Sequence, residues 1–294
     1  MEILEKKIKD VQDYRDLYFV NNPTASYDQF LIELKKKVSD LRQEIPVVQK
    51  DVKSVAAANS FIQGKILNIM PDYDSNCENY LIKAVKKDCS KWEHWLELAL
   101  CIWKKNDFEG ALDCMKEAYK ISNDLAVVNE YITVLRNQKK PELNKIAKRL
   151  CQENINKYPE DSFIWYSYAN QCLHDFYNYD KNIENLYKSL ESFEKCLQYS
   201  TSETILPSDF YLNFSSAHYS NGNILECCLN LTKAFILEPY YDTIKEKITS
   251  VNNLIEKIYE KRNEFLKDNE NIDEFSKIVL TDILDNSNKI SRFV

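Results

Sequence analysis

Hydrophobic residues between Trp95 and Asn123 recur with the spacing of two short helices. The apolar or small residues stand at offsets 0, 3, 4, 7, 13, 16, 20 and 23, in the order Trp95, Leu98, Ala99, Ile102, Phe108, Ala111, Met115 and Ala118. The first four form one stripe of a helix, and Lys105-Asn106-Asp107 predicts a turn before a second helix. Small residues in the second helix allow close packing. The segment therefore predicts one helix-turn-helix unit of a 34-residue repeat.

The same register extends to both sides of this unit. Cys77 precedes Ala111, and Ala84 precedes Ala118, by 34 residues, so a degenerate unit comes first and begins near Gly64. Three later units follow, with insertions. The first is marked by Tyr131, Leu135, Ala147, Cys151 and Pro159, and the second by Trp165, Tyr168, Ala169, Cys172, Ser189, Phe193 and Cys196. The third is marked by Tyr211, Phe214, Ser215, His218, Ile224, Cys227, Leu231, Ala234 and Pro239. A single unit cannot bury its apolar face, so the units must stack. The spacing is that of tetratricopeptide repeats and predicts an all-α superhelix, an α-α solenoid.

Amphipathic segments flank the repeats. An apolar stripe runs through residues 2–20, and a long helix is expected from Ser26 to about Leu67, kinked or broken at Pro46. A helix after Pro239 is expected to cap the last repeat. The predicted organisation is N-terminal helices at 1–60, tetratricopeptide repeats at 61–239, a capping helix at 240–266 and a polar tail, helical or partly disordered, at 267–294.

Composition narrows the function classes. The 294 residues include only 3 Gly, and a net charge of −7 with interleaved bases disfavours nucleic acid as a sequence-specific partner. No apolar run is long enough to span a membrane and no signal peptide pattern opens the chain, so a cytoplasmic protein is expected, with the nucleus as a second location. The nine cysteines fit a reducing compartment. Neither His94, His174 and His218 nor the cysteines show ligand spacing, and no catalytic motif occurs, so no metal, no cofactor and no enzyme activity are predicted.

Repeat geometry selects a line of polar residues for ligand binding. The first helix of each stacked repeat lines the concave side, and positions 2, 5, 9, 12 and 13 face into the groove. These positions hold Asn129, Thr133, Arg136 and Asn137, then Tyr166, Asn170 and His174, then Asp209, Ser216 and Tyr219, then Thr243, Glu246 and Ser250. An Asn side chain can pair with a peptide backbone through both a donor and an acceptor. An Arg at one site and an Asp at another would bind a peptide whose two opposite charges follow one another in a fixed order. The alternative is a solvated groove without a ligand.

Two further features bear on this groove. Leu96 and Leu100 occupy the positions at which co-chaperone repeats carry a carboxylate clamp, so binding to chaperone tails is not expected. The segment from His174 to Asn185 lengthens a turn by roughly eight residues. Phe176, Tyr177 and Tyr179 within it are expected to fold over the groove or onto a neighbouring helix.

The chain resembles the tetratricopeptide repeat protein five family, also called the Strap family. The segments that carry the resemblance are Tyr14-Arg15-Asp16-Leu17-Tyr18-Phe19, Gly64-Lys65, Pro71-Asp72-Tyr73, Lys83-Ala84-Val85-Lys86, Trp103-Lys104-Lys105, Val134-Leu135-Arg136, Ser208-Asp209 and Leu212-Asn213. The resemblance implies an adaptor that recognises the N-terminal Met-Arg-Glu peptide of nascent tubulin at the ribosome and triggers tubulin mRNA decay. It also implies an alternative role as a scaffold for nuclear transcription coactivators in stress responses.

The resemblance further implies site residues. An Arg and two acids of the family's groove read the peptide; the Arg matches Arg136, the first acid matches Asp209, and the second falls at Thr243, beside Asp242. The family's C-terminal OB-fold domain has no counterpart in the pattern of this chain, which is either a fragment or comes from a lineage without that domain. The predicted peptide-binding residues are Arg136, Asp209, Asn129, Thr133, Asn170, Tyr219 and Thr243.

Overall fold

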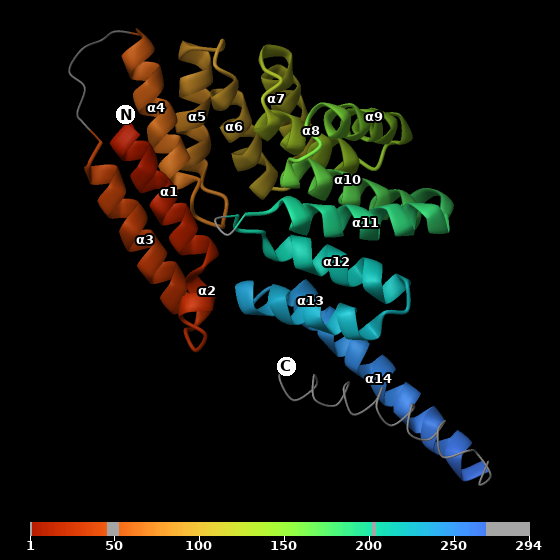
Figure 1. The fold of residues 1–294 in the computed structure, drawn as a ribbon. Coiled ribbons are helices and arrows are strands. Elements are labelled where there is room, and N and C mark those ends of the chain that lie inside the picture. The colour runs from red at the N-terminus through yellow and green to blue at the C-terminus, as the bar shows by residue number, and fades with distance from the viewer. Residues whose placement is uncertain (1, 46–52, 202–203, 269–294) are drawn as a thin grey trace. The chain divides into compact units, whose positions relative to one another are not determined.

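The structure, a computed structural model, describes residues 2–45, 53–201 and 204–268. These residues form helices, and no strand occurs among them (Figure 1). The elements are α1 (Glu2–Asp16), α2 (Tyr18–Asn21), α3 (Tyr27–Gln43), α4 (Lys53–Leu67), α5 (Ser75–Lys87), α6 (Trp92–Lys104), α7 (Phe108–Ile121), α8 (Leu125–Asn137), α9 (Pro141–Lys157), α10 (Ser162–Asp175), the π-helix η1 (Phe176–Asp180), α11 (Ile183–Tyr199), α12 (Ser208–Ser220), α13 (Ile224–Leu237) and α14 (Asp242–Asp268). In the described part of the chain no helix has the length and apolar character needed to cross a membrane.

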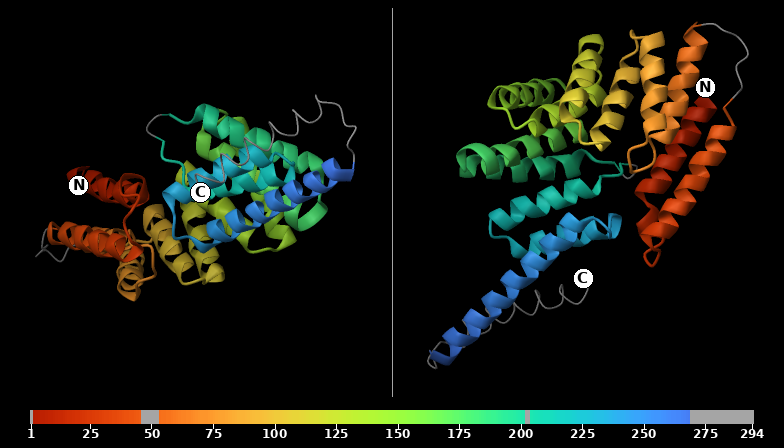
Figure 2. Two further views of the ribbon diagram at one scale, coloured as in Figure 1. Left: turned by 90° about the horizontal axis from the view of Figure 1, so that it is seen from below. Right: turned by 180° about the vertical axis from the view of Figure 1, so that it is seen from behind.

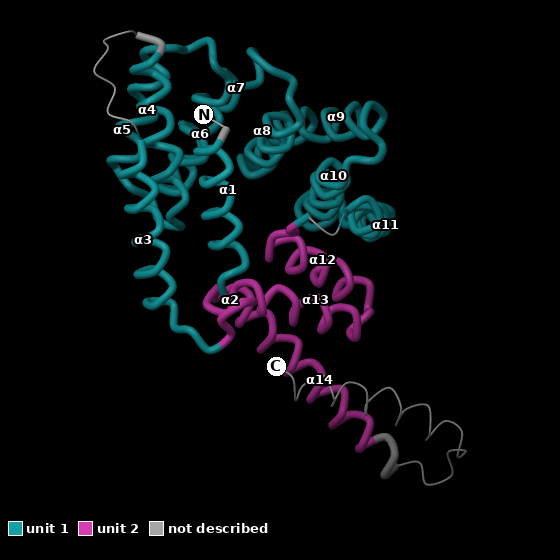
Figure 3. The backbone as a smooth tube through the Cα atoms, turned by 60° about the vertical axis from the view of Figure 1, so that its left-hand side comes forward, with its two compact units in different colours: residues 1–18, 24–204 teal, residues 19–23, 205–294 magenta. Residues whose placement is uncertain are grey.

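The chain divides into two compact units (Figure 3). Unit 1 comprises Met1–Tyr18 and Thr24–Thr204, and unit 2 comprises Phe19–Pro23 and Ile205–Val294. Unit 1 contains α4 to α11, which pair as α4/α5, α6/α7, α8/α9 and α10/α11 and lie next to one another in sequence order (Figure 2). These four pairs correspond to the helix-turn-helix units that the hydrophobic spacing predicts. The predicted boundary at residue 60 falls inside α4.

Short polar turns start the helices of unit 1. The carboxylates of Asp74, Asp107, Asp124 and Asp161 each accept a hydrogen bond from a backbone N–H in the first turn of α5, α7, α8 and α10. Such N-caps satisfy donors that the helix itself leaves unpaired. An aspartate before each of these four helices therefore fixes where the element begins.

Small residues allow the paired helices to approach closely. Ala84, Ala111, Ala118 and Ala147 are fully buried at the predicted positions. At Gly64 on α4, a Cβ atom would lie 2.5 Å from Cγ of Leu81 on α5. Glycine is needed there because the two helices pack closer than a larger residue permits.

The span from Ser26 to about Leu67, expected to be kinked or broken at Pro46, holds two helices: α3 ends at Gln43 and α4 begins at Lys53, while Pro46 itself lies outside the described residues. Another expectation about element boundaries is wrong. The lengthened turn expected from His174 is mostly helical. The π-helix η1 continues α10 directly, and only Lys181, with φ of 51°, and Asn182 separate η1 from α11. A π-helical turn absorbs extra residues without leaving the helix.

Unit 2 is built on the α12/α13 pair and the long helix α14. Its core contains Leu212, Cys227, Cys228, Leu231, Ala234, Ile244 and Val251. The apolar stripe of α14 packs against α13 through Ile244 and Val251, which are nearly fully buried. Within unit 2, Phe19 of α2 also packs against Tyr240, with ring centroids 5.4 Å apart. Of the predicted polar tail, residues 269–294 lie outside the described residues.

Candidate peptide-binding site

Helix α8 carries the central part of the predicted site. Asp124 caps its N-terminus, and the apolar stripe Val128, Ile132 and Leu135 is buried in the core of unit 1. That packing fixes the rotation of the helix. It aligns Asn129, Thr133 and Arg136 along a second stripe, as their spacing of four and three residues requires.

Arg136 is a buried cation without a counter-ion. Only 9% of its surface is exposed. Its Nη2 lies 3.5 Å from Oγ1 of Thr133, at the long limit for a hydrogen bond, and its Nη1 is buried without a partner. Among the described residues, no carboxylate lies within 4.0 Å of the guanidinium. Burial lowers the pKa of Arg136, yet a guanidinium keeps its charge in a protein.

Helix α10 places three polar side chains near this stripe. Ser167 donates a hydrogen bond of 2.8 Å to Oδ1 of Asn129 on α8. Asn170 is 9% exposed, and its Oδ1 is buried without a partner. Nδ1 of His174 is also unpaired, and burial, aided by the charge of Arg136, lowers the pKa of that imidazole. Unpaired donors and acceptors from α8 and α10 thus occur together in unit 1.

A side chain that faces a groove is expected to bury little surface, but only 9% of Arg136 is exposed. The arginine stem is enclosed between helices, and repeat register alone does not reveal this. Asn129, Thr133, Arg136 and Asn170 nevertheless lie on the two neighbouring helices that the register assigns to them.

The other predicted residues lie in unit 2. Asp209, in the first turn of α12, is exposed and has neither a hydrogen bond nor an ion pair among the described residues. Shielding by the surrounding chain raises the pKa of its carboxyl. Tyr219 of α12 is 37% exposed, and Thr243 is exposed in the first turn of α14. An acid in a first turn also stabilises a helix, which is a purely structural role open to Asp209.

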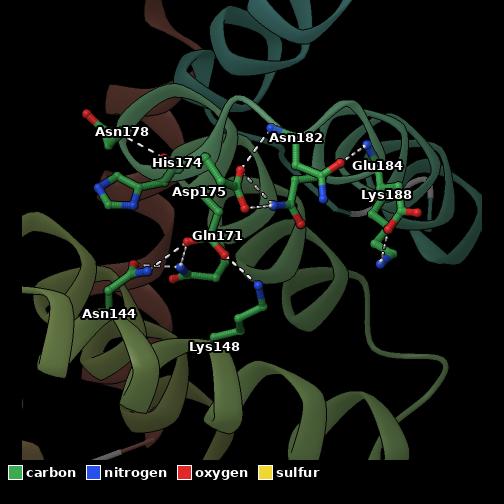
Figure 4. A network of polar contacts seen from close by, with 11 residues as sticks. Asn144, Lys148, Gln171, His174, Asp175, Asn178, Asn182, Glu184 and Lys188 are labelled. Atoms are coloured by element: carbon green, nitrogen blue, oxygen red, sulfur yellow. Dashed lines mark hydrogen bonds and ion pairs between the residues drawn. The ribbon is translucent and has the colours of Figure 1, made fainter.

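A neighbouring polar network on α9 and α10 satisfies the carboxylate of Asp175, although Oε1 of Gln171 is buried without a partner (Figure 4). The buried Asp175 accepts hydrogen bonds from Asn144 at 2.7 Å, from Gln171 at 2.9 Å and from Lys148 at 2.8 Å. The amide of Gln171 also donates to Oδ1 of Asn144 at 2.7 Å. The carboxylate has three donors, one of which is its ion-pair partner Lys148, and the network therefore holds α9 against α10.

No cluster of three or more His, Cys, Asp or Glu suited to a metal ion occurs within the described ranges. The buried cysteines pack as small core residues, as predicted for Cys77, Cys151 and Cys196. Three partly buried carboxylates on α6 and α8 are absent from the predicted site residues, namely Glu93, Glu97 and Glu130. Glu97 and Glu130 stand 33 residues apart, close to the repeat period, which is the signal that would have revealed them.

Comparison with known proteins supports the resemblance described above. No family model matches the chain. Tetratricopeptide repeat protein 5 of Bos taurus is 24% identical over 255 residues, which cover 81% of this chain and 55% of that protein. The protein of the same name from Homo sapiens is 22% identical over 257 residues, covering 84% of this chain and 57% of the relative. The chain is similar to tetratricopeptide repeat protein 5. It spans about half the length of these curated relatives.

The resemblance to the tetratricopeptide repeat protein five family is thus confirmed as a sequence similarity. Among solved structures, the crystal structure of the APC/C hetero-tetramer Cut9-Hcn1 is similar with a TM-score of 0.60 at 13% identity, covering 85% of this chain and 47% of that one. This likeness concerns the fold. The predicted all-α tetratricopeptide-repeat architecture is confirmed.

Proposed function

We propose that this protein is a peptide-binding adaptor that recognises the N-terminal Met-Arg-Glu peptide of nascent tubulin at the ribosome and promotes decay of tubulin mRNA. The repeat fold supports the general role, since stacked repeats present extended binding surfaces. The specific ligand follows from the resemblance to the tetratricopeptide repeat protein five family. Arg136 and Asp209 stand where that resemblance expects an Arg and an acid.

The main structural support for this proposal is the guanidinium of Arg136, which has no ion-pair partner among the described residues. A buried charge without a partner destabilises a fold by several kcal/mol or more, so proteins pair such charges. Arg136 has no carboxylate partner among the described residues, and its Nη1 donates to nothing. An incoming carboxylate would supply the missing acceptor through a charge-assisted hydrogen bond. The third residue of Met-Arg-Glu offers that carboxylate.

The test replaces Arg136 with Met, which keeps the aliphatic stem and removes the charge. A fluorescent Met-Arg-Glu peptide should bind Arg136→Met more weakly by roughly 1.5–3 kcal/mol, which is about 10- to 150-fold in Kd. Arg149→Met, at an exposed position on α9, is the matched control and should bind as the wild type does. Equal affinity of both variants would contradict the proposal.

A peptide with its second and third residues exchanged distinguishes the proposed tubulin adaptor from the alternative, a scaffold for transcription coactivators. A Met-Glu-Arg peptide should bind about tenfold more weakly, or roughly 1.4 kcal/mol, because it opposes like charges. A double-mutant cycle of Arg136→Met with Asp209→Asn measures whether the two residues act on one peptide. A scaffold for transcription coactivators would bind both orders equally. Pull-down of ribosomes that display a tubulin N-terminus, against ribosomes with an unrelated N-terminus, then tests the role in the cell.

A further inference from the structure

A hydrogen bond between α8 and α10 fixes how these two helices face each other. Oγ of Ser167 on α10 donates to Oδ1 of Asn129 on α8 at 2.8 Å. Short turns join both helices to α9, so α8 and α10 are each antiparallel to α9 and parallel to one another. Seven residues make about two helical turns. Two turns beyond this bond stand Arg136 on α8 and His174 on α10, which therefore lie opposite each other as Asn129 and Ser167 do.

Polar atoms along this line of the two helices lack partners. Nη1 of Arg136 and Nδ1 of His174 are both buried without a hydrogen bond among the described residues. About one turn before His174, Oδ1 of Asn170 is also unpaired, and Arg136 and Asn170 are each 9% exposed. Unpaired buried groups destabilise a fold, and a bound ligand can supply their partners. Two nitrogens on facing helices suit the two oxygens of one carboxylate.

The charged groups near His174 are cations or are already paired. Burial lowers the pKa of the imidazole most, and the charges of Arg136 on α8 and of Lys139 after α8 lower it further. The carboxylate of Asp175 acts in the opposite direction, but it is engaged by Lys148 of α9 at 2.8 Å. His174 is therefore held neutral beside a guanidinium.

The other elements packed on this end of α10 bring no unpaired acid among the described residues. The ring of Tyr179 on η1 has its centroid 5.7 Å from that of His174, and partial burial raises the pKa of its phenol, which stays neutral. Glu184, in the first turn of α11, is exposed and pairs with Lys188 at 3.8 Å. The carboxylate of a bound peptide would thus be an anion that both His174 and Arg136 can share.

We propose that His174 is a second ligand of the peptide carboxylate that Arg136 receives, and that the site takes up a proton as the peptide binds. This inference rests on the proposed function and adds regulation by pH to the same site. A carboxylate between the two side chains favours the imidazolium, whose Nδ1–H donates to it. The pKa of His174 is then higher in the complex than in the free protein. By linkage, affinity rises as pH falls from the bound pKa towards the free pKa.

Calorimetric titrations with a Met-Arg-Glu peptide, amidated at its C-terminus, test this coupling. Titrations at pH 6.5 in two buffers with different ionisation enthalpies count the protons taken up. His174→Gln keeps a polar side chain that does not titrate, so it should take up fewer protons than the wild type. From pH 8 to pH 6, wild-type affinity should rise about tenfold more than that of His174→Gln, as expected for a shift of about one pKa unit near the ordinary histidine value. His94→Gln, on α6, is the matched control and should behave as the wild type does.

A second peptide makes the same measurement without a protein variant. Met-Arg-Gln, also amidated, lacks the side-chain carboxylate. The wild type should bind it more weakly and should take up no more protons than His174→Gln takes up with Met-Arg-Glu. Equal proton uptake by the wild type and His174→Gln, or equal uptake by the wild type with both peptides, overturns the inference.

The outcome is separable from that of the proposed function. Absence of binding by the wild type would remove both. Weaker binding by Arg136→Met, with the same pH dependence in the wild type and His174→Gln, would leave the peptide-binding role standing and remove only the proton-coupled ligand. Thermal melts show whether each variant is folded at the titration temperature. If His174→Gln is not folded, the comparison of the two peptides on the wild type decides.

Discussion

At the scale of single residues, unit 1 contains charged side chains that are partly or fully buried and form no ion pair among the described residues. Arg136, Glu93 and Glu130 are each partly or fully buried without a counter-ion among the described residues. Charged groups shifted by burial cluster at functional sites more often than elsewhere. Binding sites are commonly less stable than the fold would otherwise allow. A substitution that removes the charge of Arg136 should therefore act oppositely on stability and on peptide binding.

The pH dependence of stability should show the strain at Glu130. Burial raises the pKa of this carboxyl above its value in the unfolded chain. The folded state therefore binds the proton more tightly, and the contribution of Glu130 to stability falls as pH rises from the ordinary carboxyl pKa of about 4.3 through the raised value. Glu130→Gln removes this loss. Its melting temperature should exceed that of the wild type at pH 7, and the difference should vanish towards pH 4.

Thermal denaturation followed by circular dichroism across that pH range checks the expectation. Glu153→Gln is the control, since its carboxylate lies on the surface, paired with Arg149, and should leave the difference near zero at each pH. A Glu130→Gln variant less stable than the wild type at pH 7 would show that the carboxylate has a stabilising structural partner.

At the scale of elements, neighbouring helices are joined by a few buried polar contacts in addition to apolar packing. Lys104 closes the end of α4, and Asp175 joins α9 to α10. The same aspartate precedes η1, where Asn185 of α11 contacts Asp180 through hydrogen bonds of 3.1 and 3.2 Å. The inserted segment is therefore ordered by contacts at both of its ends. Its aromatic residues pack locally, with the His174 and Tyr179 rings 5.7 Å apart.

Removal of the carboxylate at Asp175 should destabilise this junction strongly. Asp175→Ala leaves Asn144, Gln171 and Lys148 without their shared acceptor, and loss of one partner of a buried charged pair costs about 3 kcal/mol or more. Chemical denaturation measures the change in the free energy of unfolding. Asp113→Ala, in an exposed pair with Lys116, should stay within about 0.5 kcal/mol of the wild type. A similar small effect at Asp175 would show that the network adds nothing to stability.

At the scale of the whole molecule, stacked helical pairs make stability local. Each pair contacts mainly its neighbours, so the free energy of unfolding is a sum of repeat and interface contributions. The two compact units have separate cores: Leu231 and Val251 belong to that of unit 2, whereas Met115 and Ile132 belong to that of unit 1. Local damage should therefore remain within its own unit.

A core substitution in unit 2 tests this independence. Leu231→Ala removes a buried side chain between α12, α13 and α14 and should cost about 2–5 kcal/mol locally. Hydrogen exchange followed by mass spectrometry should show faster exchange in α12 and α13 and unchanged protection in α6 to α9. Equal loss of protection in both units would instead show that the chain unfolds as one cooperative block.

The hydrophobic spacing determined most of the helical architecture. Ala84, Ala111 and Ala118 occupy their predicted buried positions, because a stripe repeated every three or four residues is a local property of the chain. The same register placed Arg136 and Asn170 on neighbouring helices. It did not find the helical course of residues 176–180, since a π-helical turn disrupts the period on which the prediction depends.

Only the tertiary structure decided which charges remain unpaired. Asp175 lies 31 residues from Asn144 and 27 from Lys148, yet its contacts satisfy it fully. Arg136 and Glu130 are six residues apart on one helix, yet they do not pair. The pairing of a buried charge depends on distances across helices, which sequence periodicity does not specify. The sequence thus determined the repeats and predicted a binding stripe on α8 and α10, and the packing of these helices decided which side chains of that stripe lack partners.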